Sequence, residues 1–387
     1  MRKMGVLVLN AVVLAWFVVP DRLRIDLNVY RLGADVWLSG GDLYGRLPPT
    51  NIGNHLPFTY PPIAAVLFTP LAPLPYPVAG VLLTLLSVAA LALVVVVVLR
   101  ALDVRPGYAA VLLPAALLLE PVRVTLYFGQ INILLMALVA ADCLVRRPRW
   151  PRGALVGLAA AIKLTPIAFV LFFLLRGDRR AAGTAVLSFV VGTAAGCALN
   201  PSGSLKYWTS TVFNPDRIGK VSQESNQSLS GVLARLGVER GLLWLVLVAA
   251  VVVVGSLAVR RAGNDVEALA LNALVVLLAS PVSWSHHWVW AVPLLLAAGV
   301  TAWRTRAPAA IAATAAGVLV FLLSPHWWWD ADNGWTWLTV TIGNAYVWCA
   351  LVVLGWRRAG ARTATGVASA DRQLGRPRVD VDHRAVA

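Results

Sequence analysis

The sequence predicts an all-α protein that crosses a membrane many times. Of its 387 residues, 59% are hydrophobic and only 13% are charged, and the mean hydropathy is +0.74. Apolar stretches that approach or reach the thickness of a bilayer follow one another along most of the chain, a pattern that soluble domains do not show. Short arginine clusters separate these stretches, as in the cytoplasmic loops of membrane proteins.

The net charge of +15 raises the possibility of nucleic-acid binding. The basic residues form no continuous patch and instead interrupt apolar runs, so we expect no nucleic-acid partner. Cys143, Cys197 and Cys349 fall inside apolar stretches, too far apart in sequence for a metal-ligand motif. We interpret them as small apolar residues of the membrane core.

The arginines predict the orientation of each apolar stretch. Arg2 and Lys3 precede the run Met4–Val19, which lacks a small-residue cleavage site and is interpreted as an uncleaved signal anchor. The polar stretch Asp21–Tyr60 then lies outside. The later stretches alternate so that every arginine cluster returns to the cytoplasm: Val78–Leu99, Gly107–Leu119, Phe128–Val145, Ala181–Leu199, Leu242–Val259, Val266–Ser280, His287–Val300, Pro308–Leu323 and Trp337–Leu354.

Two further stretches do not look like ordinary spans. Ala154–Leu175 has the length of one helix, but a single crossing would leave the arginines from Arg176 onward outside. Lys163 and Pro166 interrupt this stretch, so we expect two short limbs of the kind that line a cavity. Pro61–Leu71 is short and broken by prolines, and we expect a re-entrant or interfacial helix there. With the broken segment counted as two limbs, the chain makes about twelve crossings.

This threading predicts one membrane domain, residues 1–356, followed by a disordered cytoplasmic tail, residues 357–387. External loops are expected at residues 21–77, 200–240, 281–287 and 324–336, and both termini in the cytoplasm. The protein is expected in the cell membrane with its site on the external face. The sequence contains no clear internal repeat, which argues against a transporter built from duplicated halves.

Polar residues collect on the external side of this threading. Six separated segments contribute to them: Asp26–Tyr30, Phe58–Pro62, Tyr127–Asn132, Lys163–Pro166, Glu224–Ser228 and Ser280–His287. Polar groups that converge on one membrane face indicate an active site assembled from loops.

Lys163 is the most unusual residue of these segments. Lysine occurs only at positions 3, 163, 206 and 220, and Lys163 alone lies within an apolar run. A cation inside the membrane is a candidate functional group, here as a point charge for a phosphate. The alternative is a lysine that snorkels to the outer headgroups.

His286 and His287 lie at the outer end of a predicted helix, beside Trp284. Together with the other polar segments they are candidate donors to a phosphate, whereas an interfacial belt with two solvated histidines is the alternative. Two adjacent histidines without a carboxylate at ligand spacing are a weak signal for a metal site.

Three acids follow the first apolar run: Asp26, Asp35 and Asp42. Asp26 is the nearest to the membrane surface, where a lipid-borne substrate presents its reactive carbon, and a carboxylate there can act as general base toward an acceptor hydroxyl. Spacing alone does not rank the three acids, and solvated loop residues are the alternative.

A tryptophan-rich external loop follows the stretch that ends at Leu323. Its rings either anchor the protein at the lipid headgroups or stack on sugar rings. The residues are Trp327, Trp328, Trp329, Trp335 and Trp337.

Taken together, these motifs resemble the polyprenol-phosphate-mannose-dependent mannosyltransferases of glycosyltransferase family 87, within the C-type (GT-C) superfamily. The family pattern D-x-x-V-Y-x-x-G-A is matched from Asp26 to Ala34, which ranks Asp26 above the other two acids. The remaining family motifs are matched at Tyr60–Pro62, Gly129–Asn132, Lys163–Pro166, Asn226–Ser228 and Ser283–His287. The likeness runs from about Asp26 to Trp290, most of the chain.

The resemblance implies a GT-C fold and an inverting transfer of mannose from polyprenyl-phosphate-mannose to a glycolipid acceptor, such as a phosphatidylinositol mannoside, with an α-1,2 linkage. Asp26 would be the catalytic base, and Lys163, His286 and His287 would bind the donor phosphate. The substrate-binding residues would be Tyr30, Tyr60, Gln130, Asn132, Gln223, Asn226 and Trp284. We expect no metal or other cofactor, and besides the two substrates only membrane lipids as partners.

Two alternatives remain at the level of the sequence. The donor could carry another sugar, such as arabinose or glucose, on the same type of lipid phosphate. A secondary transporter or lipid flippase is the other, but it requires polar residues through the whole membrane depth, whereas here they gather on one face.

Overall fold

The computed structural model describes residues 23–329 and 334–356. The predicted signal anchor and the predicted disordered tail lie outside them. Within the described residues the chain is helical, and its extended pairing is an isolated bridge between Asn226 and Trp284.

The first half of the described chain contains ten α-helices. They are α2 (Ile25–Leu38), α3 (Pro62–Phe68), α4 (Tyr76–Ala101), α5 (Ala109–Leu118), α6 (Glu120–Phe128), α7 (Asn132–Leu144), α8 (Ala154–Ile162), α9 (Val170–Leu175), α10 (Arg179–Leu199) and α11 (Pro201–Thr209). The 3-10 helix η3 (Thr165–Phe169) lies between α8 and α9.

The second half contains α12 (Leu229–Arg235), α13 (Leu242–Arg261), α14 (Asp265–Ala279), α15 (Ala291–Thr305), α16 (Pro308–Leu323), α17 (Trp337–Gly343) and a last helix, Ala345–Trp356. Two 3-10 helices matter for the site, η6 (Ser285–Trp290) and η7 (Pro325–Trp328).

The prediction of an all-helical membrane protein is confirmed. Three helices, α4, α10 and α13, are long and apolar enough to cross a membrane. Two bent pairs would raise the number to five: α5 with α6, bent by 73°, and α17 with Ala345–Trp356, bent by 61°. Other predicted stretches form shorter apolar helices, so the figure of about twelve crossings stays a prediction.

The predicted interruption at Lys163 is confirmed. Helix α8 ends at Ile162, and the backbone of Lys163 is extended, with φ −143° and ψ 123°. Pro166 cannot donate a backbone hydrogen bond, and the chain continues through it as the 3-10 helix η3 before α9 begins. A lysine is thereby held at the end of a short apolar helix.

Several helices form where the sequence indicated only polar loops. Helix α2 lies in the stretch predicted as an external loop, because Leu27, Tyr30 and Ala34 recur at helical spacing and are buried. Helices α11 and α12 lie in the predicted loop 200–240. Helix α6 follows α5 after a sharp bend, with Pro121 in its first turn.

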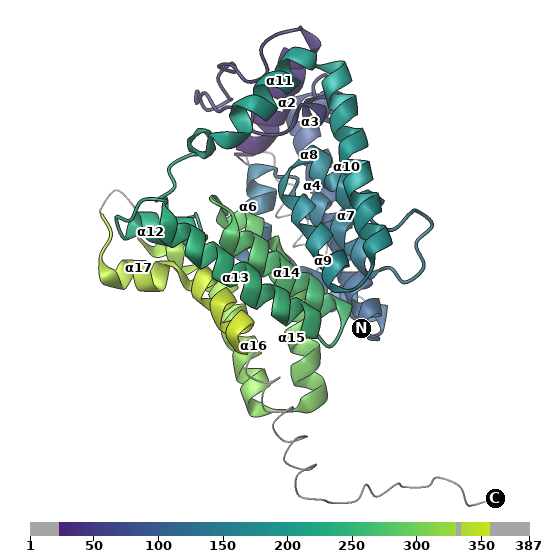
Figure 1. The fold of residues 1–387 in the computed structure, drawn as a ribbon, viewed down its shortest axis with the longest axis vertical. Coiled ribbons are helices and arrows are strands. Elements are labelled where there is room, and N and C mark those ends of the chain that lie inside the picture. The colour runs from purple at the N-terminus through teal and green to yellow at the C-terminus, as the bar shows by residue number, and fades with distance from the viewer. Residues whose placement is uncertain (1–22, 330–333, 357–387) are drawn as a thin grey trace, which may run out of the picture.

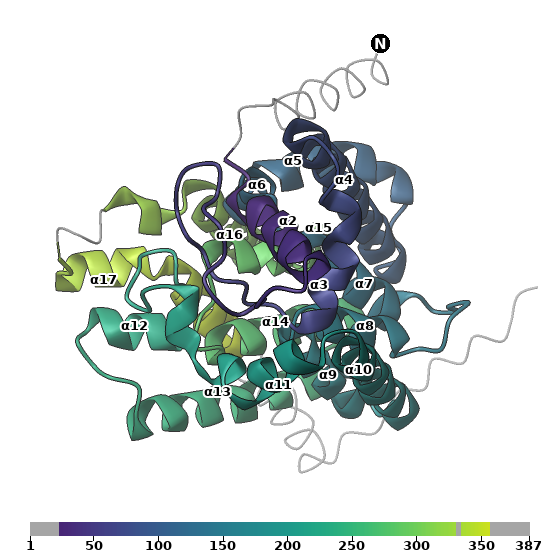
Figure 2. The same ribbon diagram turned by 90° about the horizontal axis from the view of Figure 1, so that it is seen from above.

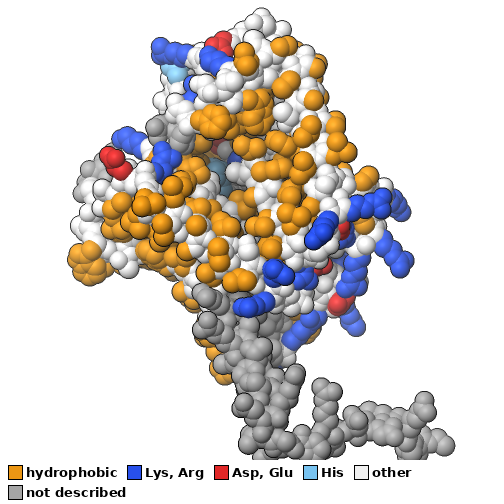
Figure 3. Space-filling model, viewed as in Figure 1, with side chains coloured by type: hydrophobic (Ala, Val, Ile, Leu, Met, Phe, Trp, Pro, Cys, Tyr) orange, Lys and Arg blue, Asp and Glu red, His pale blue; other side chains and the backbone are white. Residues whose placement is uncertain are grey.

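The helices form a tapered body with a cap at one end (Figure 1). Helices α2, α3 and α11 build the cap, and α2 lies across the ends of the other helices when seen from above (Figure 2). The α15–α16 hairpin lies at the opposite end. In Figure 3 many lysine and arginine side chains gather at the lower right of the face, others lie on the cap and at the left edge, and hydrophobic side chains cover the middle.

Candidate active site

A cavity of about 670 Å³ lies between the cap and the helices below it. Its walls come from α2, the segment before α3, the end of α6, the break after α8, the chain between α11 and α12, and the turn before η6. Figure 3 shows a hollow on this face with histidine side chains visible inside. The polar segments that the sequence separates by more than 250 residues therefore meet at one place.

Most of the predicted site residues line this cavity. They are Asp26, Tyr60, Gln130, Lys163, Gln223, Trp284, His286 and His287. Tyr30, Asn132 and Asn226 are buried and lie behind the wall, where they bind the lining residues.

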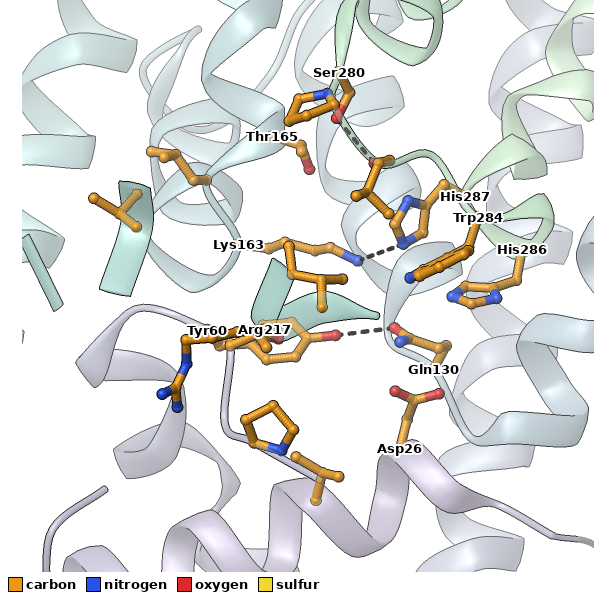
Figure 4. A pocket seen from close by; sticks show the side chains of 18 of the residues that line it. Asp26, Tyr60, Gln130, Lys163, Thr165, Arg217, Ser280, Trp284, His286 and His287 are labelled. Carbon is orange, nitrogen blue, oxygen red and sulfur yellow. Dashed lines mark hydrogen bonds between the residues drawn. The ribbon is translucent and has the colours of Figure 1, made fainter. Parts of the chain in front are cut away.

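Asp26 lies in the first turn of α2 and points into the cavity beside Gln130 (Figure 4). One turn later along the same helix, Tyr30 donates its hydroxyl hydrogen to Gln130 Oε1 at 2.9 Å. The Tyr60 hydroxyl lies 3.1 Å from the same oxygen. The carbonyl oxygen of Gln130 accepts from two tyrosines. The NH2 group of the same side chain therefore points away from them and can donate to Asp26.

Burial raises the pKa of the Asp26 carboxyl from its usual 3.8 to about 7, although the charge of Lys163 and a hydrogen bond from Gln130 act in the opposite direction. A carboxyl with a pKa near neutrality is suited to general base catalysis, since it is substantially ionised at physiological pH and still basic enough to take a proton.

Gly129 explains how Gln130 reaches this position. Helix α6 ends at Gly129, which has a φ of +68° in the left-handed region. A Cβ at this position would lie 3.0 Å from the Cβ of Leu27 in α2. Glycine therefore satisfies both the backbone turn and the close approach of the two helices.

Lys163 lies on the other side of the cavity from Asp26 (Figure 4). Its Nζ donates to Asn132 Oδ1 at 2.8 Å and lies 3.4 Å from His287 Nε2. The ammonium group is also 5.5 Å from the centre of the Tyr60 ring. These contacts fix the cation at the surface of the cavity, where it can meet an anion.

The backbone of His286 is held by two side chains. Thr125 Oγ1 and Asn132 Nδ2 both donate to the His286 carbonyl at 3.0 Å. The ring packs edge-on against Phe128, with centroids 5.6 Å apart. Its Nε2 is buried and has no hydrogen-bond partner in the described chain, so it is available to a bound ligand.

Asn226 holds together the two segments that carry Gln223 and Trp284. Its Oδ1 accepts from the Ser283 backbone N–H at 2.9 Å, and its Nδ2 donates to the Val221 carbonyl at 2.9 Å. The bridge between the backbones of Asn226 and Trp284 positions Trp284, which lines the cavity together with Gln223. Asn226 thus positions part of the cavity wall but does not itself line the cavity.

Sequence reasoning missed two polar groups near the site. Arg217 lines the cavity, donates from Nη2 to the Tyr44 carbonyl at 3.0 Å, and has a buried Nε without a hydrogen-bond partner in the described residues. Glu120 lies behind the wall and accepts from Ser285 Oγ at 2.7 Å. Neither residue belongs to a motif with recognisable spacing. The hydrogen-bond partners of Glu120 lie far from it in the sequence.

No three His, Cys, Asp or Glu side chains of residues 23–329 and 334–356 converge in the manner of a metal site. The expectation that no metal takes part in the reaction stays a prediction.

The fold and the site define a class: an all-helical membrane enzyme in which a carboxylate faces a lysine and two histidines across one cavity. The profile of glycosyltransferase family 87 matches residues 58–281. This chain belongs to that family and is a glycosyltransferase.

Several relatives are similar in sequence over most of the chain. The polyprenol-phosphate-mannose-dependent alpha-(1-2)-phosphatidylinositol mannoside mannosyltransferase of Mycobacterium tuberculosis is 43% identical, over 86% of this chain and 83% of the relative. Its counterpart in Mycolicibacterium smegmatis is 42% identical over 89% and 86%. The phosphatidylinositol pentamannoside mannosyltransferase of M. smegmatis is 35% identical over 89% and 87%. No solved structure matches the chain.

Proposed function

We propose that this protein transfers mannose from polyprenyl-phosphate-mannose to a phosphatidylinositol mannoside or related glycolipid, forming an α-1,2 linkage with inversion. The relatives named above carry this donor, acceptor class and linkage in their descriptions. The observation that carries the proposal is the placement of Asp26 on one side of a single cavity and of Lys163 with His287 on the other (Figure 4).

This placement suits a direct displacement. An acceptor hydroxyl next to Asp26 gives its proton to the carboxylate as its oxygen attacks the anomeric carbon of the donor. The bond from that carbon to the phosphate oxygen breaks on the opposite side, and the lipid phosphate leaves with the bonding electrons. Lys163 and the histidines stabilise the charge that develops on the leaving phosphate.

The lining also suits a lipid-linked donor. Apolar side chains on the membrane-helix side of the cavity come from the break after α8, from η3 and from α14, namely Leu164, Ile167, Ala168, Val276 and Ala279. A polyprenyl chain attached to the phosphate would continue along these side chains, because they offer apolar surface directly beside Lys163. No nucleotide has to be bound, since the activating group is the lipid phosphate itself.

We propose that this cavity faces the outside of the cell membrane and that both termini are cytoplasmic, as the positions of the arginine clusters indicate. Asp35 lies near the end of α2 on the cap side and Arg147 in the loop between α7 and α8, and both are exposed. A cysteine at position 35 should react with an impermeant thiol reagent in intact cells. A cysteine at position 147 should react only after permeabilisation, and the reverse result would reject the orientation.

The activity is tested with the purified protein in membranes, labelled polyprenyl-phosphate-mannose and a phosphatidylinositol mannoside acceptor. We expect label in the glycolipid and its release by an α-1,2-specific mannosidase. Polyprenyl-phosphate-arabinose and polyprenyl-phosphate-glucose serve as competing donors. Preferred transfer of either sugar would change the assignment of the donor, and no transfer of any of them would reject the proposed function.

A further inference from the structure

We infer that Trp327 is a binding platform for a sugar ring of the glycan acceptor and that Glu120 holds it in position. The inference rests on the proposed function and names the residue that recognises the acceptor. Trp327 belongs to η7, which the sequence places in the tryptophan-rich loop after α16. It lines the cavity and is 43% exposed, although the adjacent His326 is buried.

The indole of Trp327 has one polar atom, and the protein occupies it. Trp327 Nε1 donates to Glu120 Oε1 at 2.7 Å. The part of the side chain that remains exposed is therefore aromatic carbon. Such a surface can bind a ligand by stacking but not by hydrogen bonding, and the C–H face of a pyranose ring complements it.

Glu120 is a firm support for this ring. Its side chain is 2% exposed and accepts three hydrogen bonds, from Trp327, from Ser285 Oγ at 2.7 Å and from the Tyr346 hydroxyl at 2.9 Å. These donors come from η7, η6 and the last helix, so one carboxylate ties three separate segments together. An indole fixed in advance loses little conformational entropy when a sugar binds.

The contacts of this group place Trp327 on the acceptor side of the cavity. Glu120 begins α6, and Phe128, at the other end of the same helix, lines the cavity. Phe128 is followed two residues later by Gln130, the amide beside Asp26. The apolar side chains proposed for the donor lipid lie in the break after α8, on η3 and on α14 instead. The surface of Trp327 thus continues the wall that leads to the base, where the attacking hydroxyl must arrive.

The neighbouring Trp328 provides a matched control. It is 54% exposed, and its Nε1 donates to the Leu323 carbonyl at 3.0 Å, but it does not line the cavity. The two residues are adjacent in one 3-10 helix, so an effect on the local fold or on membrane anchoring would affect both substitutions. An effect on acceptor binding would be confined to Trp327, and the melting temperature separates it from the loss of the hydrogen bond to Glu120.

The test compares Trp327→Leu, Trp327→Phe and Trp328→Leu in the membrane assay, with KM measured separately for acceptor and donor. We expect Trp327→Leu to raise the acceptor KM about tenfold, equivalent to the loss of roughly 1.4 kcal/mol, and to leave the donor KM within about twofold. Trp327→Phe keeps an aromatic face but lacks the hydrogen bond to Glu120, so it should restore only part of the loss, and Trp328→Leu should match the wild type.

Two results would overturn the inference: an unchanged acceptor KM in Trp327→Leu, or an equal rise in Trp328→Leu. A fall in kcat alone, with a lower melting temperature, would show that Trp327 is structural and would overturn it as well. All of these outcomes require that the wild type transfers mannose. A wild type without transfer would reject the proposed function instead, so the two failures are distinguishable.

Discussion

Two carboxylates near the same cavity, Asp26 in its lining and Glu120 behind the wall, have opposite surroundings. Glu120 is buried and accepts hydrogen bonds from Ser285, Trp327 and Tyr346. Asp26 faces the cavity with the Gln130 amide beside it and the Lys163 ammonium opposite. A carboxylate that is fully hydrogen-bonded organises structure, whereas one that is buried with few partners is available for chemistry.

The raised pKa of Asp26 also lowers the stability of the folded protein at neutral pH, and this effect can be measured. The pKa of Asp26 is raised to about 7, so between pH 4 and pH 7 the folded protein binds a proton that the unfolded chain has lost. This contribution to stability is fully present below about pH 4 and is lost as the pH rises through 7. The site thus retains a destabilising charge at neutral pH, as functional sites often do.

The largest effect is expected for Asp26→Asn. The amide cannot take the proton of the acceptor hydroxyl, so we expect transfer to fall by about 1,000-fold or more. The free energy of unfolding at pH 8 should be equal to that of the wild type or higher, because the buried charge is removed. Transfer assays and thermal melts measure the two quantities. Asp35→Asn, on the exposed end of the same helix, is the control and should keep wild-type transfer.

A smaller loss is expected for Lys163→Met, which keeps most of the length of the side chain and removes the charge. The leaving phosphate loses its nearest cation, and we expect kcat to fall by roughly 100-fold. A fall below threefold would contradict the placement of the phosphate beside Asn132 and His287. Binding of a non-transferable donor analogue should weaken in parallel, which a titration of the analogue would show.

The pH dependence of transfer distinguishes the role of Asp26 from that of Glu120. Transfer depends on the ionised form of Asp26, so kcat/KM should rise with pH, about tenfold per unit below pH 7, and level off above it. Removal of the Lys163 charge takes away an influence that lowers this pKa, so the rise should move to higher pH in Lys163→Met. A profile that is flat from pH 5 to pH 8 would contradict the assignment of the base.

Glu120→Gln should show the reverse of Asp26→Asn. A neutral amide leaves at least one of the three donors without a proper acceptor, so we expect a loss of about 2 to 4 kcal/mol in stability. Transfer should fall only about tenfold, through displacement of the Trp327 ring, and the pH profile should keep its midpoint. Thermal melts and the same kinetic assay test this. A stable variant with abolished transfer would assign a catalytic role to Glu120.

The smallest effect is expected for Asp42→Asn. Asp42 forms an ion pair with Lys206 at 2.6 Å, in which both side chains are about half exposed. Exposed pairs contribute roughly 0 to 1 kcal/mol, so melting temperature and transfer should change little. A large loss of transfer would show that this contact between the cap loop and α11 controls access to the cavity.

The sequence predicted a large part of this arrangement because membrane constraints are strong. Apolar length and arginine position identified α4, α10 and α13 within a few residues. Lys163 and Pro166 predicted the break between α8 and η3, since a cation and a proline have clear consequences within an apolar helix. The convergence of the polar segments followed once the stretches were threaded in order.

The rest depends on tertiary contacts that leave no local pattern. Helix α2 was hidden in a polar stretch, because only one of its faces is buried, and that face packs against α3. Glu120 was not singled out, since its partners Ser285 and Tyr346 lie 165 and 226 residues further along the chain. The distinction between lining residues and supporting residues, such as Gln130 and Tyr30, also needs the folded structure.

A structure with a bound phosphonate analogue of polyprenyl-phosphate-mannose would test the central claim most directly. We predict the phosphonate oxygens within hydrogen-bond distance of Lys163 and His287, and the anomeric carbon between them and the Asp26 carboxylate. A phosphonate bound away from Lys163, or an anomeric carbon with Asp26 on the same side as the leaving group, would contradict the proposed displacement.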